Sequence, residues 1–269
     1  MHLTSISLGK IPSADATRFP FAVPAVANLG TLELTTAVTL LVGENGSGKS
    51  TLLEGLAAAT GLPTVGADSA DRDPTLVQQR KLGKALTLAW KRRTHRGFFL
   101  RAEDFFGFAK QVARLRAEMF ERIAELEEEY RDRSAYAKGL AQGPLRASIA
   151  ELERSYGVDL DASSHGQSFL RLFQSRFVPN GLYILDEPEA ALSPQSQLAL
   201  LALIADGVAQ SSQFIIATHA PIVLAYPGAT IFSFDRIPPA SVPFEELDHV
   251  SLTRSFLNNP QSYLRHLIP

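Results

Sequence analysis

The sequence predicts an α/β fold: a mainly parallel sheet flanked by helices, with an antiparallel β region and an inserted helical lobe. Three short apolar runs, at residues 38–42, 182–185 and 214–217, have the length and composition of buried strands. Segments 50–59 and 194–209 follow the first two runs and are predicted to be helices. Strands that alternate with helices favour a parallel sheet, because each crossover brings the chain back to the same edge.

The middle of the chain has a different pattern. Apolar residues alternate along 85–90, and 97–100 is a second strand-like run. The basic segment KRRTHR between them is therefore predicted to be the tip of a hairpin, which makes this the antiparallel region.

A charged helical segment follows. From about Glu103 to Lys138, apolar residues recur at steps of three and four, which predicts one face of a helix. Gly139 and the pair Gly143-Pro144 are expected to end it, with a second helix over 145–156. We therefore expect a single domain over residues 1–269, with a helical lobe inserted at about 104–165.

Composition excludes several classes of protein. The chain has 269 residues, a net charge of −2 and no cysteine, so it has no disulfide, no cysteine-bound zinc and no general field for polyanions. Its start lacks the pattern of a signal peptide, and no uncharged stretch is apolar enough to span a bilayer. We expect a soluble, cytoplasmic protein without a transmembrane segment.

Residues 43–50, GENGSGKS, fit the pattern G-x-x-x-x-G-K-[ST] between a predicted strand and a predicted helix. Glycines let backbone N–H groups curl around phosphates, and the positive end of the following helix points at them. Lys49 is expected to reach the β- and γ-phosphates, and the Ser50 hydroxyl to ligate Mg²⁺. The alternative is a glycine-rich turn with a chance lysine. The candidate ATP-binding residues of this P-loop are Gly43, Asn45, Gly46, Ser47, Gly48, Lys49, Ser50 and Thr51.

A second candidate element is LYILDE at 182–187. A buried strand would deliver Asp186 to the water shell of the metal beside the P-loop, and Glu187 would polarise the attacking water. Two carboxylates at a strand end can also be a solvated turn. The preceding P-loop and the following Pro188 favour the catalytic interpretation.

Together these motifs resemble the ABC-type P-loop ATPases. Four segments occur in the order of that family: Gly43 to Ser50, Leu185 to Pro188, Ala191 to Ser193, and Ala217 to His219. The wider pattern is similar to small soluble bacterial ATPases described as predicted ATPases of the AAA family, themselves similar to recombination and chromosome-maintenance ATPases. The residues that carry this likeness are Phe19 to Phe21, Gly43 to Gly46, Phe98 to Glu103, Ser164 to Gly166, and Asp186 to Pro194.

The resemblance gives a role to SSHGQS, residues 163–168. In the family, a signature loop precedes the strand aspartate by some twenty residues, and Gln167 precedes Asp186 by 19. The resemblance implies that Ser164, His165, Gly166 and Gln167 contact ATP bound to the P-loop of a second subunit, in a head-to-tail dimer. A plain serine helix cap is the alternative for Ser164. Glycine is usual at the position of His165, so the role of this histidine is open.

Three further positions follow from the same resemblance. His219 matches the switch histidine that contacts the γ-phosphate, which makes Lys49, Glu187 and His219 the catalytic candidates. Glu103 stands where the family has a metal-contacting glutamine, and it either binds Mg²⁺ with Ser50 and Asp186 or caps a helix. Ser193 stands where many relatives have an aspartate that couples the two subunits.

The motifs do not decide what process ATP hydrolysis drives, and three classes of ATPase remain open. The first is an ATP-driven dimer that acts in DNA repair or in another process with nucleic acid or a partner protein. The second is the motor subunit of a transporter, and the third is an ATP-dependent dimerisation switch with slow hydrolysis. The region from Arg80 to Arg101 has eight Lys or Arg residues and no acid, which favours contact with a phosphate backbone. The alternative for that region is a solvated hairpin tip.

Overall fold

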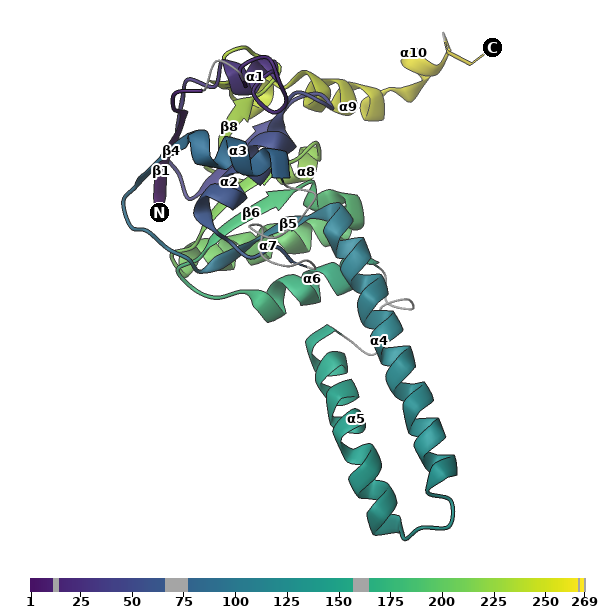
Figure 1. Cartoon of the computed structure of the whole chain (residues 1–269). Coiled ribbons are helices and arrows are strands. Elements are labelled where there is room, and N and C mark those ends of the chain that lie inside the picture. Colours follow the sequence, from purple (N-terminus) through teal and green to yellow (C-terminus); the bar gives the residue numbers. More distant parts are fainter. Residues whose placement is uncertain (12–14, 66–76, 157–164, 266, 269) are drawn as a thin grey trace.

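A computed structural model of the chain describes residues 1–11, 15–65, 77–156, 165–265 and 267–268 (Figure 1). Within these ranges, the larger of two sheets has the strand order β5-β6-β7-β3-β8-β9. Its first five strands are parallel, and only β9 pairs antiparallel, with β8. The predicted α/β fold with a mainly parallel sheet is confirmed. The strands are β3 (Val38–Val42), β5 (Gly97–Arg101), β6 (Leu182–Asp186), β7 (Gln213–Ala217), β8 (Thr230–Ser233) and β9 (Ala240–Ser241).

The smaller sheet is antiparallel and has the order β2-β1-β4. Its strands are β1 (Leu3–Leu8), β2 (Thr31–Glu33) and β4 (Leu86–Trp90). Leu86, Leu88 and Trp90 of β4 are half-buried against the core while Thr87 and Ala89 are exposed, which is the alternation expected of a strand with one wet face.

Helices cover both faces of the large sheet. Its central strands are buried on both sides, so Tyr183 and Leu185 of β6 pack toward α6 and α7, while Leu182 and Ile184 pack toward α2 and the small sheet. α3 packs in turn on α2. The helices of these layers are α2 (Lys49–Thr60), α3 (Val77–Ala85), α6 (His165–Arg176) and α7 (Pro194–Ala209), with the short α1 (Pro24–Ala27) and α8 (Pro221–Leu224) at the rim.

The segment KRRTHR is not the tip of a hairpin. β4 pairs with β1 in the small sheet, whereas β5 pairs with β6 in the large one, so residues 91–96 cross from one sheet to the other. Thr94 anchors the crossing: its side chain is buried, and its Oγ1 donates to the carbonyl of Asn180 at 3.2 Å. The prediction was wrong because alternation identifies a strand but not its partner.

The inserted region is a hairpin of two long helices, α4 (Ala102–Glu129) and α5 (Ala135–Tyr156), which run side by side away from the sheets (Figure 1). The chain turns at Tyr130–Ser134 and not at Gly139, since Ser134 accepts from the N–H of Ala137 and starts α5. Pro144, expected to break the helix, lies inside α5. It deprives the carbonyl of Leu140 of a helical donor, but Leu140 is 63% exposed and water can take that place.

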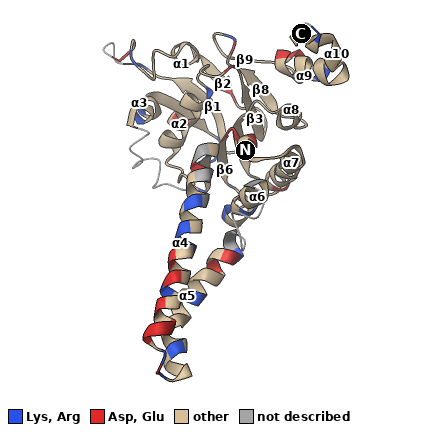
Figure 2. Cartoon of the chain, turned by 90° about the vertical axis from the view of Figure 1, so that its right-hand side faces the viewer, with Lys and Arg blue, Asp and Glu red and all other residues tan. Residues whose placement is uncertain are grey.

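Charged residues are concentrated on this hairpin, where acidic and basic positions are interspersed along both helices (Figure 2). At the other end of the molecule, α9 (Asp248–Asn258) and α10 (Pro260–Leu264) lead away from the body (Figure 1). These are two separate helices, because Pro260 starts a new helix. Within the described part of the chain, no helix is both long enough and apolar enough to cross a membrane.

Candidate nucleotide-binding site

The P-loop joins the end of β3 to the start of α2 and has the backbone that its glycines permit. Gly43, Gly46 and Gly48 all have positive φ, at 154°, 82° and 104°. A Cβ on Gly48 would lie 2.7 Å from Cγ1 of Val23, so this position has no room for a side chain. Asn45 and Gly46 form the exposed tip of the loop, and Gly43, Gly48 and Lys49 lie at its buried base.

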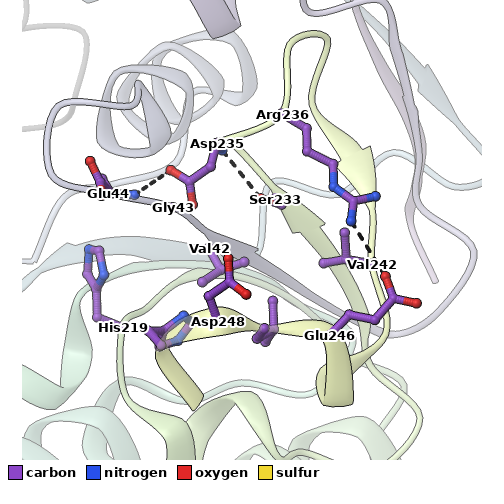
Figure 3. Close-up of a pocket in the computed structure, with 12 residues that line it drawn as sticks. Val42, Gly43, Glu44, His219, Ser233, Asp235, Arg236, Val242, Glu246 and Asp248 are labelled. Carbon is purple, nitrogen blue, oxygen red and sulfur yellow. Dashed lines mark hydrogen bonds and ion pairs between the residues drawn. The ribbon is translucent and has the colours of Figure 1, made fainter. Parts of the chain in front are cut away.

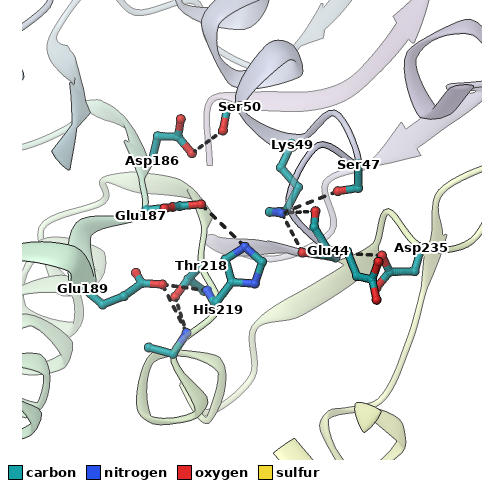
Figure 4. A network of polar contacts seen from close by, with 12 residues as sticks. Glu44, Ser47, Lys49, Ser50, Asp186, Glu187, Glu189, Thr218, His219 and Asp235 are labelled. Carbon is teal, nitrogen blue, oxygen red and sulfur yellow. Dashed lines mark hydrogen bonds and ion pairs between the residues drawn. The ribbon is translucent and has the colours of Figure 1, made fainter. Parts of the chain in front are cut away.

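Lys49 is only 3% exposed and points back into its own loop (Figure 4). Its ammonium donates to the carbonyls of Gly43 at 2.6 Å and Glu44 at 3.0 Å. Burial lowers the pKa of Lys49, and the nearby carboxylates of Glu187 and Asp186 partly offset that effect. The ammonium of Lys49 is thus a buried positive charge held inside the loop by two backbone carbonyls, and a polyphosphate needs such a counter-charge.

Ser50 and Asp186 meet across the site. Ser50 is the second residue of α2, Asp186 ends β6, and the Ser50 hydroxyl donates to Oδ1 of Asp186 at 3.2 Å. Burial raises the pKa of Asp186 to about 7, with further contributions from Glu187 and Glu54. A buried carboxylate with one hydroxyl partner fits the oxygen ligand set of Mg²⁺, whose charge would offset the desolvation of Asp186.

Glu187, His219 and Glu189 form a second group beside Lys49 (Figure 4). Glu187 has a left-handed backbone, with φ of 49°, and its Oε1 lies 3.5 Å from Nε2 of His219. Oε1 of Glu189 accepts from the backbone N–H of His219 at 2.6 Å and of Ala220 at 3.2 Å. The carboxylate of Glu189 thus holds the loop after β7 so that His219 faces Glu187. Sequence analysis assigned no role to Glu189.

Asp235 is a further residue that sequence analysis missed. It follows β8, the neighbour of β3, and its Oδ1 accepts from the backbone N–H of Glu44 at 2.7 Å (Figure 3). Gly43, Glu44, His219 and Asp235 line one wall of a cleft of about 510 Å³, which the start of α9 closes on the far side. Nothing in the local sequence signals this contact, because Asp235 belongs to no motif.

Arg101 closes the opposite side of the site. It is the neighbour of Asp186 in the β5–β6 register, and it is 7% exposed. Its guanidinium binds both carboxylate oxygens of Asp104, at 2.7 and 2.8 Å, and Oε1 of Glu54 at 3.1 Å. Burial disfavours the charged form, but these hydrogen bonds outweigh it and raise the pKa of Arg101. The prediction that the basic region extends to Arg101 is therefore wrong, because this charge is buried and paired.

The structure describes the predicted signature loop only in part. Ser164 lies outside the described residues, and the side chains of His165 and Glu103 also lie outside the description. α6 begins at His165, Gln167 is exposed, and Gly166 packs closely: a Cβ there would lie 2.8 Å from Oγ of Ser196. Ser193 caps α7 by accepting from the N–H of Ser196 at 3.2 Å, a local role that needs no partner subunit.

Comparisons with known proteins give the following matches. Residues 26–86 match the family described as AAA domain, and among curated proteins no sequence matches the chain significantly. An inward-facing putative metal-chelate type ABC transporter is 18% identical, over 92% of this chain and 86% of that chain, with a TM-score of 0.47. The Smc head domain of Pyrococcus furiosus, bound to the C-terminal domain of ScpA, is 13% identical, over 95% and 99%, with a TM-score of 0.44. The SMC head domain of Thermotoga maritima is 14% identical, over 90% and 99%, with a TM-score of 0.40.

The AAA-domain match covers the P-loop and its flanking strand and helix. Beyond that match lie the other parallel strands of the large sheet and the paired carboxylates at the end of β6. In the order of its motifs, the chain is similar to the ABC-type P-loop ATPases.

Proposed function

We propose that the protein binds ATP with Mg²⁺ and hydrolyses it, and that it does so as a head-to-tail dimer. The observation that carries the proposal is the meeting of three groups at the carboxyl edge of one sheet. These groups are the buried ammonium of Lys49, the pair Ser50–Asp186 and the pair Glu187–His219. Their residues follow the ends of three strands, β3, β6 and β7, and parallel strands bring these ends to one edge.

Each group has a distinct chemical task. The loop N–H groups and Lys49 hold the β- and γ-phosphates, and Ser50 with Asp186 holds the metal. Bound Mg²⁺ supplies charge that stabilises the phosphoryl group during transfer. Glu187 accepts a proton from the attacking water, and His219, held by Glu189, orients Glu187 and contacts the γ-phosphate. Glu103 remains a proposed metal contact, and Asn45, Gly46 and Thr51 remain proposed ATP contacts.

The dimer is proposed because the signature segment stands at the start of α6, whereas the P-loop stands at the start of α2. α6 begins at His165, and the backbone N–H groups of a helix start attract anions. Ser164, His165, Gly166 and Gln167 would complete the ATP site of the opposite subunit.

The direct test is phosphate release by the purified protein with Mg²⁺ and ATP. Lys49→Ala should lose ATP binding, because the phosphates lose their buried counter-charge. Glu187→Gln should still bind ATP but turn over roughly 100-fold more slowly, the usual scale for a lost general base. Release at the wild-type rate by both variants would refute the proposed site. Slow wild-type release, with dimers that form only with ATP, would instead favour the switch.

A further inference from the structure

A second cleft lies where the parallel strands of the large sheet begin, whereas the P-loop lies where they end. It has a volume of about 470 Å³ and opens beside Gly97, where β5 begins, whereas the P-loop follows the end of β3. Three segments line it: Pro63–Val65 after α2, residues 95–98 where the crossing enters β5, and Ser175, Arg176 and Val178 at and just after the end of α6. None of these residues takes part in the proposed hydrolysis.

The charge of this cleft has one sign. Among the described residues that line it, His95, Arg96 and Arg176 are basic, and none is acidic. All three side chains are exposed, and none of them forms an ion pair in the described part of the chain. The cleft beside the P-loop is different, because Glu44, Asp235, Glu246 and Asp248 line it.

Thr64 adds an independent signal. It is 3% exposed and lines the cleft, and its Oγ1 has no hydrogen-bond partner in the described part of the chain. Buried hydroxyls nearly always have a partner, because an unpartnered one loses its hydration without compensation. The hydroxyl is shielded from solvent, so the acceptor oxygen of a ligand in the cleft would become its partner once the side chain turns toward the cleft.

Further basic residues lie on the crossing segment that leads into the cleft. Lys91, Arg92 and Arg93 are exposed on the same crossing segment, whose backbone is anchored by the buried Thr94. A single small anion would use only the cleft, whereas a chain of phosphates would use both the cleft and this extension.

We propose that this cleft binds a phosphate of a nucleic-acid backbone, with Arg96 and Arg176 supplying the charge and the Thr64 hydroxyl a hydrogen bond. The site is separate from ATP hydrolysis, so binding is expected without nucleotide. Of the basic region between Arg80 and Arg101, the proposal assigns phosphate contacts only to residues 91–96 and none to Arg101. It adds Arg176, which is distant in the sequence.

The test is the binding of fluorescent DNA and RNA oligonucleotides to the full chain across a series of salt concentrations. Arg96→Gln with Arg176→Gln should weaken binding and make the slope of log K against log salt shallower by roughly 1 to 2, since each lost phosphate contact removes about one. Lys110→Gln with Arg254→Gln removes the same charge from exposed positions elsewhere and should leave the slope unchanged.

The variant Thr64→Val distinguishes an effect on oligonucleotide binding from an effect on the stability of the fold. Removing an unpartnered buried hydroxyl should raise the melting temperature of the ligand-free protein, yet it should weaken oligonucleotide binding several-fold. The inference is overturned if the wild type binds no oligonucleotide at low salt, or if the cleft variant and its control behave alike. It is equally overturned if inorganic phosphate or a phosphopeptide binds as tightly as the oligonucleotide.

Discussion

The carboxylate of Asp235 accepts a hydrogen bond from the backbone N–H of Glu44 at 2.7 Å and so joins the end of β8 to the first turn of the P-loop. This contact braces the loop, but it also puts a negative charge near the place proposed for phosphates. The two effects oppose each other, and two substitutions separate them.

Asp235→Asn removes the charge but leaves an amide oxygen that can accept from Glu44. It should bind ATP several-fold more tightly than the wild type, because a repulsion is gone. Asp235→Ala also removes the charge but loses the acceptor, so its affinity should fall below that of the Asn variant. Calorimetry with a slowly hydrolysed ATP analogue measures both. Equal affinities for the two variants would show that the hydrogen bond does not shape the loop.

Asp186 should destabilise the protein when no metal is bound. Its folded-state pKa of about 7 lies above the usual 3.8, so the folded protein holds a proton that the unfolded chain releases. The bound proton adds to the free energy of unfolding. This contribution is fully present below pH 3.8 and is lost as pH rises through 7. In EDTA, Asp186→Asn should therefore raise the melting temperature above pH 7 and have little effect near pH 4, while Mg²⁺-dependent ATP binding is lost. A lower melting temperature above pH 7 would contradict this account of the buried carboxylate.

Glu189 should act on turnover more than on binding. Glu189→Ala removes the acceptor for the N–H groups of His219 and Ala220, so His219 is no longer held toward Glu187. We expect kcat to fall roughly tenfold with a small change in KM, the pattern for a group that supports only the transition state. Glu245→Ala, at an exposed position, is the control. A rise in KM with unchanged kcat would place Glu189 in ATP binding instead.

The proposed dimer predicts complementation between two inactive variants. Ser164→Arg would obstruct the subunit interface, and Lys49→Ala would abolish ATP binding, so each homodimer should lack activity. In a mixed dimer both defects fall on one composite site, and the other site has an intact P-loop and an intact signature. Mixing should restore part of the phosphate release if one site suffices. If Glu187→Gln forms no dimer with ATP in light scattering, the head-to-tail arrangement is refuted.

The sequence by itself determined the elements in which chemistry and local structure are contiguous. Glycines at 43, 46 and 48 allow the positive φ values that the loop between a β-rich run and a helix requires, so the position of the P-loop was predictable. The same holds for Asp186, because a buried strand carries its last residue to the edge of the sheet. The period of three and four residues also identified α4, but not where it ends. Glycine and proline at 139–144 are weak breakers on an exposed helix, and Ser134 started α5 earlier.

Only the tertiary structure decided which distant residues meet. Asp235 and Glu44 are 191 residues apart, and they touch because β8 happens to pair with β3. Arg101 and Arg96 belong to one basic run, yet β5 carries Arg101 into a buried cluster with Glu54 and Asp104 and leaves Arg96 beside Arg176 in an open cleft. Strand pairing and burial set the partners of a charge, and neither is encoded in the neighbouring residues. The sequence therefore determined what the loop between β3 and α2 can hold, and the packing of the sheets decided which side chains surround it.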